Sequence, residues 1–128
     1  QKLVDVHGVA HISGGSIPEK VGRMLRASRL GALIDNPFEL PDVMKHCQEI
    51  AEIKSGDTYR PMSDEEMITT WHGGQGYILA LPESDVQTVL DLVPGSKPIG
   101  RVTKEPNITV LSKGFQTPGK LMKFDLAA

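Results

Sequence analysis

The 128-residue sequence predicts a single α+β domain, a layered α/β arrangement in which helices cover a mixed β-sheet. Short β-rich segments alternate along the chain with segments whose apolar residues recur at helical spacing, and this alternation favours helices packed on strands. The length and the 39% hydrophobic content are enough for one buried core without cross-links. A single cysteine, Cys47, excludes an intrachain disulfide and favours a reducing, cytoplasmic location.

Charge and aromatic content argue against two classes of partner. Fourteen basic residues face sixteen acidic ones, for a formal net charge of −2, so no positive field attracts nucleic acid or an anionic membrane. Aromatic residues make up 5% of the chain, and a base-stacking surface is not expected. The longest apolar runs span only a few residues, so we expect no membrane segment. Small anionic ligands remain compatible with this composition.

The first third of the chain has the pattern of strand, turn, helix and strand. Residues 4–12 are β-rich and alternate loosely between apolar and polar, which predicts a strand. The segment Ser13-Gly14-Gly15-Ser16 predicts a tight turn. Ser16 is expected to cap the following helix, with Glu19 completing a capping box. Residues 30–35 are typical of a short buried strand.

The middle of the chain predicts two more helices and a loop. Pro41 opens a helix whose apolar residues recur at helical spacing, and Cys47 on that stripe is expected to pack in the core. The polar residues 54–61 predict a loop. Ser63 and Glu66 have the spacing of a capping box and therefore predict the start of a third helix.

The last third begins with a second glycine-rich turn at residues 72–76. Four further elements are expected in order: a strand over residues 77–81, a helix over 85–92, and strands over 99–102 and 108–111. Residues 114–128 show little pattern and are expected to be an ordered extension or a tail. The domain proper is therefore predicted to span residues 1–113.

The first glycine-rich turn is the most informative candidate site, because it follows a strand and precedes a helix. Amides at a helix N-terminus are unpaired and lie at the positive end of the helix dipole, which favours an anion. His11 lies two residues before Ser13, on the same strand face, and is the candidate catalytic acid or base. A core histidine and a purely structural turn are the alternative. The candidate phosphate-binding residues are Ser13, Gly14, Gly15, Ser16 and Glu19.

The second glycine-rich turn lies in the reverse order, between a helix and a strand. Its bare amides are candidates for a second wall of a ligand cleft. The alternative is a helix C-cap whose glycines take the left-handed conformation. The candidate binding residues here are His72, Gly73, Gly74 and Gly76.

No metal site is expected in this sequence. His7 and His11 share a strand face but have no carboxylate at metal-ligand spacing. The acidic run at residues 64–66 is explained by capping and by the helix dipole rather than by metal binding.

The motif VDVHGVAHISGG at residues 4–15 resembles the opening of the C-terminal domain in the phosphoribosylformylglycinamidine cyclo-ligase family. The family pattern there is approximately VHA-x-AH-[IL]-TGGG, followed by Glu-Asn and an Arg-Val-Leu helix. The resemblance covers most of residues 3–112 and continues through the second turn, where the family has Asn-Cys-Gly-x-Gly-Met. Ser16 replaces the third glycine, Lys20 replaces the Asn, and His72-Gly73 replaces Asn-Cys. Residues 54–62 are longer than the family usually has.

The resemblance implies an activity as well as a fold. Family enzymes use ATP to activate the formyl oxygen of formylglycinamidine ribonucleotide as a phosphate ester. An internal nitrogen then attacks, and aminoimidazole ribonucleotide, ADP and phosphate form. By resemblance, ATP and Mg²⁺ would be bound mainly by an N-terminal domain that this chain lacks, and the full enzyme would be a homodimer. The partners implied are a small ribonucleotide substrate and that N-terminal domain, so the chain alone is expected to be inactive.

Two alternatives remain open at this point. The first is another ATP-dependent member of the same superfamily, of the selenophosphate synthetase or hydrogenase-maturation type. The second is a non-catalytic binding or assembly module, in which the glycine-rich turns are structural. In that case the face formed by Arg23, Arg26 and Arg29 would contact a partner.

Overall fold

The centre of the fold is a four-stranded mixed sheet with one parallel and two antiparallel pairings. The structure is a computed structural model and describes residues 2–126. In spatial order, the strands are β6 (Arg101–Thr103), β2 (Gly31–Ile34), β7 (Asn107–Leu111) and β8 (Leu121–Asp125). β2 is parallel to β7 and antiparallel to β6, so the predicted mixed sheet of an α+β domain is confirmed.

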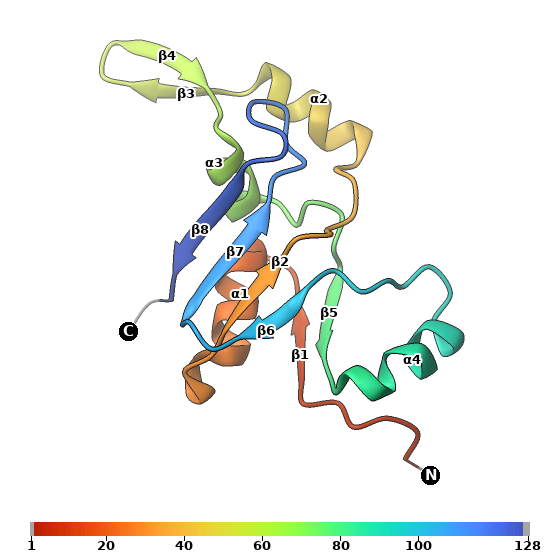
Figure 1. The fold of residues 1–128 in the computed structure, drawn as a ribbon. Helices are drawn as coiled ribbons and strands as arrows, with labels where there is room; N and C mark the ends of the chain where they lie inside the picture. Colours follow the sequence, from red (N-terminus) through yellow and green to blue (C-terminus); the bar gives the residue numbers. More distant parts are fainter. Residues whose placement is uncertain (1, 127–128) are drawn as a thin grey trace.

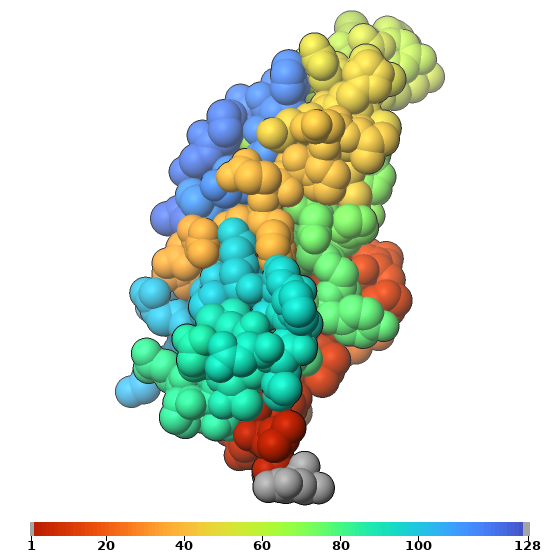
Figure 2. Space-filling view, turned by 90° about the vertical axis from the view of Figure 1, so that its right-hand side faces the viewer, coloured from red at the N-terminus to blue at the C-terminus, as the bar shows by residue number. Residues whose placement is uncertain are grey.

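Two smaller antiparallel pairs complete the β-structure (Figure 1). One is a ribbon of β1 (Gly8–His11) and β5 (Tyr77–Ala80); the other is a hairpin of β3 (Glu52–Ser55) and β4 (Thr58–Pro61). The hairpin lies at one end of an elongated molecule and the N-terminal segment at the other (Figure 2).

Four α-helices and two short 3₁₀ turns connect these strands. They are α1 (Ser16–Leu25), η1 (Arg26–Ser28), α2 (Asp42–Ile50), α3 (Asp64–Thr70), η2 (Glu83–Asp85) and α4 (Val86–Leu92). Helix α1 contacts β1, β2, β7 and α3, so it lies between the four-stranded sheet and the β1–β5 ribbon (Figure 1). The core therefore forms around α1.

The core is built from the apolar faces of α1, α3 and the central strands. Ile17 and Ile108 are fully buried, and Val21 and Val110 are nearly so. These residues recur at i, i+4 on the helix and at i, i+2 on the strand, which is the spacing that places them on one face of each element. The remaining buried apolar residues are Ala10, Ile12, Leu25, Ala32, Ile34, Leu40, Met62, Met67, Ile68 and Met122.

Most predicted elements are present close to their expected positions, including the helix opened by Pro41 and the strand and helix after the second turn. The capping box at Ser63 is confirmed: its hydroxyl accepts a hydrogen bond from the Glu66 amide at 3.1 Å, while the Glu66 carboxylate accepts one from the Ser63 amide at 2.9 Å. The prediction that Cys47 packs in the core is wrong, because Cys47 is only half-buried. The fully buried residue of α2 is Gln48.

The predicted capping box at Ser16 is wrong. The helix is capped by Gly15 in the left-handed conformation, with no side-chain hydrogen bond. Ser16 is fully buried and its hydroxyl donates to the Trp71 carbonyl at 2.6 Å, so it is not free to cap the helix. Glu19 instead pairs with Arg23 on the helix surface.

The predicted loop at residues 54–61 is wrong as well, because most of it forms the β3–β4 hairpin. Lys54 pairs with Tyr59 across two strands joined by the two-residue turn Gly56-Asp57. Gly56 has φ 65°, a conformation that short hairpin turns require and that glycine adopts without strain. The polar character that predicted a loop reflects strands exposed on their faces.

The C-terminal residues contain a strand. β8 pairs with β7 in antiparallel register, and Met122 on it is 1% exposed. Residues 121–126 therefore contribute to the core, with Phe124 and Leu126 packed against it. Within residues 2–126, no helix is long and apolar enough to cross a membrane.

Candidate functional site

The two glycine-rich turns lie side by side at one end of the β1–β5 ribbon. The Ile12 amide donates to the Gly76 carbonyl at 2.8 Å, and the Ser16 hydroxyl reaches Trp71 just before the second turn. Because β1 and β5 are antiparallel, the end of one strand lies next to the start of the other. The sequence therefore brings both candidate loops to one place.

The first turn presents two free backbone amides. The amides of Gly14 and Gly15 donate to no acceptor within residues 2–126, whereas the Ser16 amide is taken by the Ser13 carbonyl at 2.8 Å. Gly14 is exposed, and among the described residues no heavy atom lies within 4 Å of where its Cβ would be. Gly14 and Gly15 precede the ten-residue helix α1, so their amides add to the positive end of its dipole.

Glu19 places a carboxylate against this same turn. The space that a Cβ on Gly15 would occupy is filled by the Glu19 side chain. The carboxylate also accepts from the Arg23 guanidinium at 2.5 Å and lies 3.5 Å from the Lys20 ammonium. The Glu19 carboxylate that lies against Gly15 is therefore paired with two cations, Lys20 and Arg23.

His11 is exposed and stacks on Tyr77, its direct partner across the ribbon. The ring centroids are 4.8 Å apart and the planes differ by 24°. His11 is thus a surface residue beside the first turn rather than a core histidine. Sequence reasoning missed Tyr77, because only the β1–β5 register places it opposite His11.

The second turn is held by side chains as well as by its own backbone. The His72 imidazole Nδ1 accepts from the Gly74 amide at 2.8 Å. Gly73 and Gly74 have φ values of 66° and 102°, while Gly76 is exposed. Helix α3 ends earlier, at Thr70, so these glycines are not its C-cap.

Gln75 is the buried residue of the second turn, at 2% exposure. Its side-chain oxygen accepts from the Phe38 amide at 2.5 Å, and its side-chain nitrogen donates to the Gly73 carbonyl at 3.0 Å. Gln75 therefore fixes the turn to the segment after β2. It was not among the predicted site residues, since a polar residue between glycines reads as exposed.

A buried carboxylate that the sequence reasoning explained by capping has another role. Asp64 is fully buried and accepts from Gln48 at 2.7 Å and from Ser112 at 2.5 Å. The amides of Gln116 and Thr117 each donate to it at 2.9 Å. Burial raises the pKa of Asp64, but these hydrogen bonds outweigh burial and hold the pKa below its usual value.

Comparison with known proteins assigns the family. The family model described as "AIR synthase related protein, C-terminal domain" matches residues 1–113. The chain belongs to this family. The resemblance seen in the AHISGG motif is thereby confirmed, and the AIR synthase related domain includes both glycine-rich turns and the His11–Tyr77 pair.

Relatives of this AIR synthase related domain carry the name phosphoribosylformylglycinamidine cyclo-ligase. The protein of Synechococcus sp. (strain JA-2-3B'a(2-13)) is 31% identical over 99 residues, which is 77% of this chain and 25% of the relative. The protein of Methanosarcina acetivorans is 29% identical over 103 residues, which is 80% of this chain and 27% of the relative. The protein of Clostridium novyi (strain NT) is 26% identical over 98 residues, which is 75% of this chain and 27% of the relative. The chain spans about a quarter of the length of these relatives.

Proposed function

We propose that this chain acts as the C-terminal domain of a phosphoribosylformylglycinamidine cyclo-ligase. In that role it contributes to ATP-dependent closure of formylglycinamidine ribonucleotide to aminoimidazole ribonucleotide, in purine biosynthesis. Support comes from the family match over residues 1–113 and from the names of the relatives. The observation that carries the proposal is the pair of free amides at Gly14 and Gly15 at the start of α1.

The first turn would bind a phosphate group of the ribonucleotide. Two adjacent amides and a helix N-terminus suit a phosphate, whose oxygens accept several hydrogen bonds. The Glu19 carboxylate must move away from Gly15, because two anions at one site repel each other. Once it moves, the Lys20 and Arg23 cations can pair with the phosphate, and Glu19 can accept a hydrogen bond from a ribose hydroxyl.

His11 would be the proton-transfer group of this domain. The attacking nitrogen loses a proton as the ring closes, and an exposed imidazole beside the phosphate turn can accept that proton. Stacking on Tyr77 restricts the ring to one plane, which would orient its nitrogens toward the substrate. Gly73, Gly74 and Gly76 would form the facing wall, and His72 would hold that wall through Gly74.

The remaining parts of the reaction would come from elsewhere in the full-length protein. Among residues 2–126, no group of three histidine, cysteine or acidic side chains is placed to hold a metal ion. ATP and Mg²⁺ would therefore be bound by the part of the enzyme that corresponds to the unmatched length of the relatives. A homodimer of the full enzyme and a cytoplasmic location complete the proposal.

A chimeric enzyme tests this proposal. The matching 99 residues of the Synechococcus relative would be replaced by those of this chain, and formation of aminoimidazole ribonucleotide would be measured. We expect ATP-dependent turnover and a loss of at least about tenfold on His11→Ala, the lower range for a removed acid–base group. His7→Ala is the matched control, since His7 already pairs with Asp5 outside the turn. A folded chimera without turnover, or one indifferent to His11→Ala, contradicts the proposed role.

A further inference from the structure

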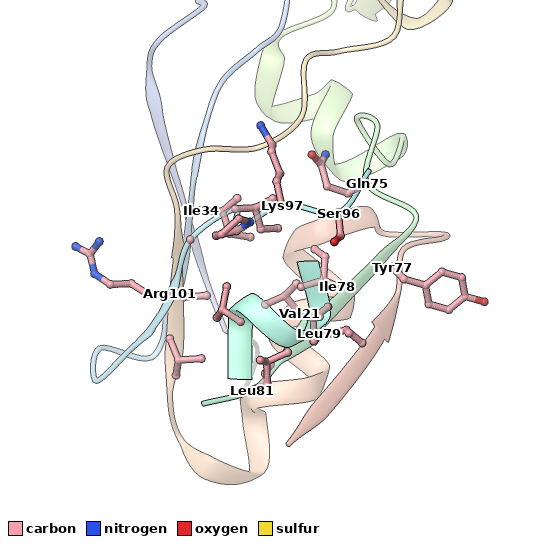
Figure 3. Close-up of a pocket in the computed structure, with 18 of the residues that line it drawn as sticks. Val21, Ile34, Gln75, Tyr77, Ile78, Leu79, Leu81, Ser96, Lys97 and Arg101 are labelled. Atoms are coloured by element: carbon pink, nitrogen blue, oxygen red, sulfur yellow. The ribbon is translucent and has the colours of Figure 1, made fainter. Parts of the chain in front are cut away.

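An apolar cavity of about 380 Å³ lies beneath α4 (Figure 3). Its walls come from α1, β2, β5, α4 and the segment that leads into β6. Residues 11–16 do not line it, but Gln75 of the second turn and Tyr77, the stacking partner of His11, do, so the cavity adjoins the site proposed above without including its first turn. Such a volume falls within the range of small-molecule sites.

Helix α4 lies at the surface of the molecule (Figure 2), and several of its residues line this cavity. Val86, Val89 and Leu90 line the space and are only half-buried, although they form the apolar stripe of the helix. On the opposite side, Val21 of α1 and Ile78 of β5 line the same space (Figure 3). Apolar side chains on two sides thus face a space instead of each other, which leaves packing contacts unmade.

The charged residues that line the cavity have one sign. Among the residues that line it, Lys97 and Arg101 alone carry a formal charge, and both are cations. Arg101 points away from the cavity and lies 3.7 Å from the Asp35 carboxylate (Figure 3). Lys97 lies at the end of the cavity nearest Gln75 (Figure 3), and within residues 2–126 no carboxylate is within ion-pair distance of its ammonium.

The ammonium of Lys97 is held by neutral groups and keeps capacity for an anion. It donates to the Pro37 carbonyl at 3.0 Å, lies 3.5 Å from the Asn36 side-chain oxygen, and lies 4.9 Å from the centre of the Phe38 ring. An ammonium has three N–H donors, so at least one remains for a ligand. The carbonyl and the ring stabilise the cation without neutralising it.

We propose that this cavity binds a small amphipathic monoanion, an aliphatic or aromatic carboxylate, with its apolar body under α4 and its carboxylate on Lys97. The apolar body would supply packing contacts to Val89 and Ile78, which line the cavity and are only half-buried, and the carboxylate would pair with the Lys97 ammonium. Ligand sites commonly combine an apolar lining with a few polar groups that fix orientation. This proposal stands whether or not the chain acts in a cyclo-ligase.

Titration of the 128-residue chain with octanoate and with 1-octanol, followed by amide NMR shifts, tests the proposal. We expect saturable shifts for residues that line the cavity, such as Ile78 and Gly100. Lys97→Met should weaken octanoate binding by about fivefold, as expected for a partly exposed ion pair, and should leave octanol binding unchanged. Lys97→Arg should restore octanoate binding. Lys123→Met is the matched control, because Lys123 is an exposed lysine on β8, and it should not change the binding of either ligand.

A second variant tests the location. Val89→Phe places a ring from α4 into the cavity and should abolish binding of both ligands while thermal unfolding stays cooperative. Octanoate binding that is insensitive to Lys97→Met, or absent from the wild-type chain, overturns the proposal. So does a loss of the octanoate-induced shifts as the chain dimerises at higher concentration, because a second copy would then cover the cavity.

Discussion

The carboxylate of Asp64 accepts a 2.5 Å hydrogen bond from the hydroxyl of Ser112, and thereby joins the first residue of α3 to the residue after β7. The same carboxylate accepts hydrogen bonds from Gln48 and from the loop that leads to β8. Gly114 lies so close to Asp64 that a Cβ there would overlap the carboxylate. One buried acid therefore holds α2, α3 and the loop between β7 and β8 together.

Asp64→Asn should destabilise the domain by about 3 kcal/mol, because an amide nitrogen would face donors and leave buried hydrogen bonds unmade. Urea unfolding followed by Trp71 fluorescence measures the free energy. Glu65→Gln is the matched control: Glu65 pairs with Lys120 at the surface and should contribute about 1 kcal/mol or less. Equal effects of the two changes would contradict the structural role given to Asp64.

The stability of the chain should fall in acid partly through Glu66. The Arg60 guanidinium, with help from the Ser63 amide, lowers the pKa of Glu66 from 4.5 to about 2. The pKa of Glu66 is lower in the folded state than in the unfolded state. The stabilisation that ionised Glu66 gives to the fold is therefore complete above pH 4.5 and is lost as the pH falls toward 2. Melting temperatures across this range should fall less steeply for Glu66→Gln than for the wild type. Glu52→Gln serves as control, because Glu52 is exposed and forms no ion pair within residues 2–126. Parallel curves for wild type and Glu66→Gln would refute the linkage.

Adjacent glycines of the first turn should respond differently to alanine. Gly15→Ala should cost about 1–2 kcal/mol, since φ is 82° there and the Glu19 side chain fills the space. Gly14→Ala should leave stability nearly unchanged, because open space surrounds that position among the described residues. Thermal unfolding of the two variants compares them directly. A larger loss at Gly14 would show that the backbone of the turn differs from the one described.

Strand β8 should prove to be part of the folded unit. Met122→Ala should lower the free energy of unfolding by about 3 kcal/mol, the usual cost of removing a buried large side chain. Its neighbour Leu121 points to the other face and is 56% exposed, so Leu121→Ala should cost well under half as much. Denaturant unfolding of both variants gives the comparison. If Met122→Ala is as mild as Leu121→Ala, β8 is a dispensable tail.

Periodicity predicted the helices and central strands, because these elements bury one face and so carry a clear apolar spacing. It failed for β3 and β4, whose side chains are exposed or half-buried and so show no strand alternation. It also failed for β8, where Met122 is the one fully buried side chain. Strands that bury little leave little trace in a sequence.

The candidate site was predicted in part for a related reason. Glycines and a following helix are local features, so the free amides of Gly14 and Gly15 could be foreseen. The positions of Ser16, Tyr77 and Asp64 could not, because each is set by a partner 48 or more residues away: Trp71, His11 and Ser112. Ser16 has the sequence signature of a cap, yet tertiary burial assigned its hydroxyl elsewhere.

The most direct test of the central claim is whether the first turn binds phosphate. Amide NMR spectra of the chain would be recorded during titration with ribose 5-phosphate and, as control, with ribose. We predict saturable shifts of the Gly14 and Gly15 amides with the phosphate ester alone, and tighter binding after Glu19→Gln, which removes the competing carboxylate. Unchanged amides in both the wild type and Glu19→Gln, or equal shifts with ribose, would contradict the account.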